Sequence, residues 1–322
     1  MRRKIIKQGH NTLTITLPAK WVSDNSIKAG EEIEIDESDK KCLRILPSSH
    51  HNPEEKSIQI DVSGLDHNTI RQKLRSAYKL GYEEIALTFE NSMVKELRTD
   101  KDFPIMELIN HEISNLIGCE IIKQSDNSCL IKDYAVDSEL EFDNTLRRVF
   151  ILIVDYGQSL VEQIKKGDIQ SLKGMRERHF NIAKFIFYCQ RLINKGAVQD
   201  NRNATFLYYI VSELDEILDI MKYAAADWIE YNKKNIDKEM ITILTKIIEQ
   251  NKNFYEFYYK PTANNLKTLV DNRWYVRKKI KNLIHKLQKE DLFILKDTSF
   301  ILELYYHLSE ARMSLDYTPK HS

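Results

Sequence analysis

The chain has 322 residues, enough for two or three domains, and its 42% hydrophobic and 30% charged residues exclude a disordered or fibrous protein. Lys plus Arg and Asp plus Glu both total 48, so the whole-molecule charge gives no reason to expect nucleic acid, although a balanced total can conceal a basic patch. The four cysteines are scattered without a CxxC pair, which argues against a zinc ribbon or a disulfide scaffold.

The start of the chain does not resemble a secretory signal. Basic residues follow Met1, and an alternating polar and apolar pattern comes next where a signal peptide would have an apolar core. No apolar run approaches the roughly 18 residues that a membrane-spanning helix needs. We therefore expect a cytoplasmic protein with no membrane insertion.

The first fifty residues have the pattern of a small β-rich domain, which we place at residues 1–48. Gly9 and Asn11 lie in a turn cluster between two alternating segments, and Pro18 precedes a short helix over 19–24. Strands are predicted over residues 3–8, 12–17, 31–36 and 43–46. The expected order is therefore β-β-α-β-β.

A polar stretch bounded by Pro47 and Pro53 is typical of a linker, and a small α/β domain over residues 55–135 follows it. The pattern predicts the order β-α-β-α-β-β. The strands are expected at 57–62, 85–89, 119–124 and 128–133, and the helices at 68–80, capped by Asn68, and at 104–117.

From residue 138 to residue 322 the pattern is helical almost without interruption. Breaks near residues 167, 196–203, 235, 261 and 290 divide this stretch into six helices. Helices of this length suit an elongated all-α bundle, and six similar ones suggest two three-helix repeats. The predicted fold class is therefore multidomain α+β.

The run RRKIIKQGHNTLTITLPAKWVSDNSIKAGEEIEI resembles the SpoVT-AbrB (MazE-like) swapped-hairpin family, most strongly in the TLPAKW segment of residues 16–21. The resemblance implies that two chains exchange hairpins to close one barrel, so that the protein is a homodimer, and that the barrel binds double-stranded DNA.

The charge of this segment agrees with DNA binding. Residues 1–30 contain six basic side chains and one acidic one, which gives a net charge of +5 within a neutral chain. The alternative is a dimerisation module whose lysines only keep it soluble. The expected DNA contacts are Arg2, Arg3, Lys4, Lys7, His10, Asn11, Thr12 and Lys20.

The combination of this module with an α/β domain and a long helical half resembles archaeal PhoU-like phosphate uptake regulators. That resemblance implies a divalent or iron-type metal on the helices, bound by an acidic motif. At the corresponding place on the second helix of the bundle this chain has His179, Asn181 and Ala183, and neither Asn nor Ala supplies an anionic oxygen ligand.

Two other pairs keep the spacing of a metal site. Asp215 and Asp219 lie four residues apart and so share one helical face, as do Glu303 and His307. The alternative is an ordinary solvated acidic helix face.

We find no Gly-rich phosphate loop, no HExxH and no GxSxG, so an enzyme is not expected. The sequence predicts a transcriptional regulator that controls phosphate uptake, whose helical half senses a partner or an effector. Its further partner would be a phosphate transporter or a regulator of that transporter. The alternative is a homodimeric adaptor that does not bind DNA and negatively regulates such a transporter by protein contact. A metal-dependent enzyme on the bundle is a third interpretation.

Overall fold

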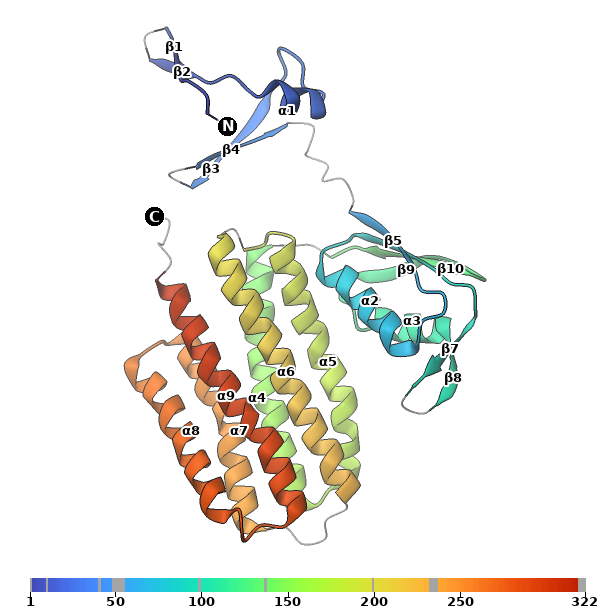
Figure 1. Cartoon of the computed structure of the whole chain (residues 1–322), viewed down its shortest axis with the longest axis vertical. Helices are drawn as coiled ribbons and strands as arrows, with labels where there is room; N and C mark the ends of the chain where they lie inside the picture. The colour runs from blue at the N-terminus through green and yellow to red at the C-terminus, as the bar shows by residue number, and fades with distance from the viewer. Residues whose placement is uncertain are drawn as a thin grey trace. The chain divides into compact units, whose positions relative to one another are not determined.

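The computed structural model describes residues 2–9, 11–39, 42–47, 56–97, 100–135, 138–198, 200–231 and 237–317. The chain divides into two compact units, residues 1–55 and residues 56–320. Together they form a multidomain α+β protein, as the sequence predicts (Figure 1).

The first unit contains two separate antiparallel hairpins and one short helix. The first hairpin pairs β1 (Ile6–Gln8) with β2 (Thr12–Thr14), and the second pairs β3 (Ile33–Asp39) with β4 (Cys42–Pro47). Between them α1 (Ala19–Asp24) begins after Pro18, whose fixed backbone angle favours a helix start. The predicted order β-β-α-β-β is therefore present. The closed barrel stays a prediction, because within one chain the two hairpins form separate sheets.

The second unit begins with a four-stranded sheet of order β5-β6-β10-β9. β5 and β6 are parallel, and the other two pairings are antiparallel. The strands are β5 (Ser57–Asp61), β6 (Glu84–Thr88), β9 (Cys119–Ser125) and β10 (Ser128–Asp133). Burial alternates along β6 and β10, which is the pattern of a sheet with one covered face.

Two helices accompany this sheet, α2 (His67–Lys79) and α3 (Ile105–Ile113), and they pack against each other (Figure 1). The side chain of Asp66 accepts hydrogen bonds from the backbone N–H groups of Asn68 and Thr69, so the N-cap of α2 is Asp66 and the predicted Asn68 cap is wrong. The sequence pattern also misses a hairpin, β7 (Met93–Glu96) with β8 (Lys101–Pro104).

Helices of 21 to 31 residues make up the rest of the second unit and pack as a bundle. They are α4 (Glu139–Lys166), α5 (Ile169–Asn194), α6 (Asn201–Tyr231), α7 (Lys238–Tyr259), α8 (Ala263–Leu283) and α9 (Lys289–Asp316). Their breaks fall where the sequence predicts them. The division into two PhoU-like repeats stays a prediction.

The bundle and the α/β layer share one hydrophobic core. α2 packs against α5, which lies at the edge of the bundle nearest the sheet (Figure 1). Tyr78 of α2 is fully buried, and the ring of Phe187 on α5 lies under the cations of Arg75 and Lys79. The predicted domains 55–135 and 138–322 therefore lie within a single compact unit. None of the helices in the described part of the chain is long and apolar enough to cross a membrane.

Candidate functional site

The first hairpin places three of the expected DNA contacts, Lys7, Asn11 and Thr12, near its turn. Lys7 pairs with Leu13 and Gln8 with Thr12 across the strands, and Gly9 adopts a φ of +73° that the tight turn requires. Asn11 and Thr12 follow the turn directly. His10, the remaining residue predicted there, lies outside the described residues.

The basic side chains of this module are exposed and have no acidic partner among the described residues. This holds for Arg2, Arg3, Lys4, Lys7 and Lys20. A lysine or arginine without an intramolecular ion pair keeps its full charge available for a phosphate group. These five charges are therefore exposed and not paired within the described part of the unit.

The same unit has no core of its own. None of its described side chains between residues 2 and 47 is buried. Its large apolar side chains are half or more exposed: Ile5 (67%), Ile6 (52%), Leu13 (67%), Ile15 (54%), Ile35 (53%) and Leu43 (64%). A unit of this size buries little apolar surface alone, and a set of exposed apolar residues of this kind is typical of an interaction surface.

Residues 6–51 match the profile of a family described as the antidote-toxin recognition protein MazE, a bacterial antitoxin. The match covers the small N-terminal unit and leaves the α/β layer and the bundle unassigned. No curated protein matches the chain significantly. A MazE/AbrB-like domain is consistent with a DNA-binding regulator, and domains of this kind typically dimerise.

On the bundle, two of the residues predicted as metal ligands, Asp219 and Glu303, form ion pairs with neighbouring side chains. His179 on α5 lies with its Nε2 atom 2.5 Å from Oδ1 of Asp219 on α6, and Nζ of Lys222 approaches the same oxygen to 2.5 Å. Burial acts to raise the pKa of Asp219, but the hydrogen bonds from His179 and Lys222 outweigh it and lower this pKa to about 2. Asp219 is therefore held ionised between two donors.

Asp215 lies one turn before Asp219 on α6. Burial raises the pKa of the Asp215 carboxyl above its ordinary value, while Lys79 of α2 opposes this rise and Asp219 adds to it. A carboxyl of this kind is a poor anionic ligand unless a cation offsets its burial.

The two residues of the second predicted pair, Glu303 and His307, lie in different surroundings. Glu303 of α9 accepts hydrogen bonds from Arg273 and Arg277 of α8, with Nε of Arg273 at 3.0 Å. Burial acts against the charged form of Glu303, but the two guanidinium groups outweigh it and lower its pKa. His307, one turn further along, is exposed.

Among the described residues no group of three or more His, Cys, Asp or Glu side chains is placed to hold a metal ion. The carboxylates of Asp219 and Glu303 accept hydrogen bonds from cationic side chains in this structure and are not free of partners. Metal binding by these helices stays a prediction.

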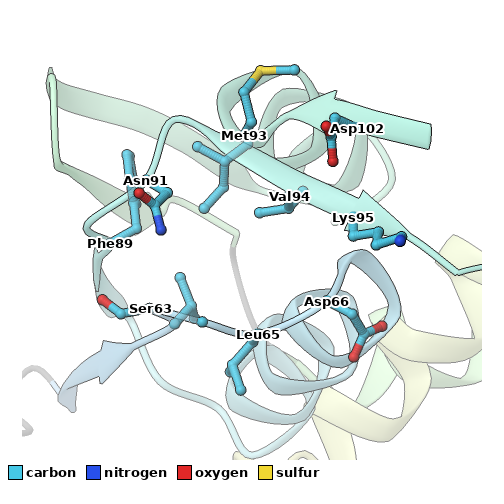
Figure 2. A pocket seen from close by; sticks show the side chains of 12 residues that line it. Ser63, Leu65, Asp66, Phe89, Asn91, Met93, Val94, Lys95 and Asp102 are labelled. Carbon is cyan, nitrogen blue, oxygen red and sulfur yellow. The ribbon is translucent and has the colours of Figure 1, made fainter. Parts of the chain in front are cut away.

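The α/β layer contains a cavity of about 300 Å³, a feature that the sequence does not reveal. Figure 2 shows the β5–α2 loop, which carries Ser63 and Leu65, on one side of the cavity and the strand that carries Val94 and Lys95 on the other. Two polar side chains that line the cavity have partners within the chain. Lys95 forms an ion pair with Asp100 at 2.7 Å, and Asp66 caps α2. We assign no function to this cavity.

Proposed function

We propose that this protein is a DNA-binding transcriptional regulator that acts as a homodimer through its N-terminal unit. One observation carries the proposal: five exposed, unpaired basic side chains lie on a unit whose sequence matches a MazE-type antitoxin domain. Arg2, Arg3, Lys4, Lys7 and Lys20 would contact phosphate groups. Asn11 and Thr12 at the hairpin turn, with His10, would contact phosphates or base edges.

The exposed apolar side chains support the dimer. In the proposed assembly a second chain covers Leu13, Ile15 and Leu43, so that the two hairpins of each chain complete one barrel with those of the partner. Folding of the module and dimerisation would then be one process, and a dimer would present the basic surface twice.

The helical half is proposed to sense an effector or a partner, and the signal that we favour is phosphate supply. The resemblance to PhoU-like regulators supports this choice of signal. The proposed role is the control of phosphate uptake in the cytoplasm, with contact to a phosphate transporter or its regulator. We propose no enzymatic activity.

The alternative is an adaptor that uses the module only to dimerise. A variant with three reversed charges distinguishes the regulator from the adaptor. It carries Arg2→Glu, Arg3→Glu and Lys7→Glu. The regulator predicts that this variant loses DNA binding while it remains a dimer. Absence of DNA binding by the unaltered protein, even at low salt, would favour the adaptor.

A further inference from the structure

The most basic segment of the second unit is the C-terminal half of α8 with the turn that follows it. Between residues 272 and 289 there are seven basic side chains and no acidic one. Asp271 and Glu290 border this stretch, and most of the other acidic residues of the neutral chain lie further away in the sequence. The segment is therefore a local basic surface within a balanced protein.

The seven cations divide into two groups. Arg273 and Arg277 both pair with the carboxylate of Glu303 on α9, and they lie 5.3 Å and 5.7 Å from the centre of the Trp274 ring. The other five are lysines that form no ion pair with any described residue: Lys278, Lys279, Lys281, Lys286 and Lys289. The arginines hold the helix in place, whereas the lysines remain available.

The unpaired lysines include two on the outer face of the helix. Trp274, Lys278 and Lys281 follow one another at spacings of four and three residues, so they share one face, and all three are exposed. The side chains of Leu269 and Val276 are buried, and α8 packs against α7 and α9. We call the exposed set Trp274, Lys278 and Lys281, with Lys286 beyond the helix end, the α8 basic face.

Nothing in the described part of the chain covers this face. α5, at the edge of the bundle nearest the sheet, has α2 packed against it, whereas the extensive packing of α8 involves only α7 and α9 among the described elements (Figure 1). Trp274 remains 50% exposed as a result. The α8 basic face is a rigid, solvent-facing array of positive charge.

We infer that the α8 basic face binds the phosphate backbone of double-stranded DNA. Charge complementarity carries this assignment, because unpaired lysines on a straight helix release counterions from a polyanion without reading its sequence. An anionic membrane is the competing partner, because Trp274 (50%) and Ile284 (47%) are also exposed here, and it is one outcome of the test. The inference rests on the proposed function, to which it adds a second, sequence-independent contact.

The test uses the full-length protein with Lys278→Glu and Lys281→Glu together. The matched control is Lys123→Glu with Lys173→Glu, two exposed lysines on β9 and α5 that also form no ion pair with a described residue and give the same charge change. Equal thermal midpoints of the two variants would show that both fold. Binding to a labelled specific duplex and to a random duplex is then titrated across salt.

We expect the α8 variant to bind both duplexes on the order of tenfold more weakly than the control at the same salt. The slope of log K against log salt should fall by about 0.9 for each phosphate that is no longer neutralised, hence by about 2 for the two lysines of one chain. The preference for the specific duplex should be unchanged, because phosphate contacts carry no direct sequence information.

Three results would overturn the inference. If the α8 variant and the control bind DNA with equal affinity and slope, the face does not contact DNA, although the proposed function stands. If the unaltered protein binds no DNA, the proposed function and the inference both fail. If the α8 variant keeps DNA binding but loses binding to vesicles of anionic lipid, the face recognises lipid phosphate instead.

Discussion

Arg191 of α5 donates a hydrogen bond from Nη2 to the carboxylate of Asp133 at the end of β10, and both side chains are buried. Its Nη1 atom donates to the backbone carbonyl of Tyr78 at 2.6 Å. One guanidinium group thus links the bundle to a strand and to a helix of the α/β layer. This link helps to explain why the two predicted domains form one compact unit.

Arg191→Met should destabilise the second unit by about 3 kcal/mol, because it removes the hydrogen-bonded cation of the buried Asp133 carboxylate and leaves only one cation, Lys195, at 3.9 Å. Urea unfolding measures this change. Lys166→Met is the control, since it breaks an exposed ion pair with Glu162 and should leave the midpoint unchanged. Equal midpoints for the two variants would mean that the buried pair does not join the layers.

Gly157 on α4 allows a close approach between helices. A Cβ atom at this position would lie 2.6 Å from Nδ2 of Asn251 and 2.7 Å from Cγ2 of Ile248, both on α7. Gly157→Ala should therefore destabilise the bundle by about 1–3 kcal/mol, even though Ala favours helices.

Gly174→Ala on α5 is the matched control, because a Cβ atom there meets nothing within 4 Å. It should stabilise the protein by about 0.5–1 kcal/mol. Thermal unfolding of both variants checks the pair, and stabilisation by Gly157→Ala would contradict the packing described.

The lowered pKa of Asp219, which lies beside His179 and Lys222, predicts a pH dependence. An acid whose pKa is lower in the folded than in the unfolded state stabilises the fold above the unfolded pKa, and this contribution disappears as pH falls. For Asp219 the window runs from 3.8 down to about 2. The difference in urea midpoint between the unaltered protein and Asp219→Asn should therefore shrink as pH is lowered through that window.

Asp155→Asn provides a comparison for this experiment, because it removes only an exposed ion pair with Arg178. Its midpoint should follow that of the unaltered protein at every pH. A difference for Asp219→Asn that stays constant between pH 7 and the acid limit would refute the role assigned to the ion pair.

The regular elements can be predicted from the sequence because the spacing of their apolar residues agrees with the positions of the residues that begin and end them. The bounds of α1 match the prediction, and the breaks after α4, α5 and α7 contain Gly167, Gly196 and Pro261. The β7–β8 hairpin escapes prediction because its strands are short, partly charged and pair only with each other. Such strands have neither the alternation nor the apolar content of a buried strand.

The pairing of His179 with Asp219 follows from the order of the helices. The spacing of the acidic residues alone does not predict it. The two residues lie at equal sequence distances, 20 residues, from position 199 near the turn between α5 and α6. Antiparallel helices joined there bring them to the same level, so the acidic side chain predicted as a metal ligand meets a histidine instead. The whole-molecule charge does not reveal the α8 basic face, because acidic residues elsewhere in the chain offset its positive charge.

Leu13→Asp should turn the proposed dimer into a monomer, because it places a charge among the apolar side chains that a second chain would cover. Leu140→Asp on α4 is the control, as Leu140 is similarly exposed (72% against 67%) but lies outside the module. Sedimentation or light scattering gives the mass of each variant. A Leu13→Asp protein that remains dimeric would place the dimer interface elsewhere.

DNA binding by the N-terminal unit is tested most directly by the affinity of the full-length protein for its own upstream DNA and for phosphate-transporter promoters. The titration is made across salt with a random duplex as competitor. We predict a specific complex whose affinity falls steeply with salt and which Arg2→Glu, Arg3→Glu and Lys7→Glu together abolish. No binding to any duplex at low salt would contradict the proposed regulator and leave the module as a dimerisation unit only.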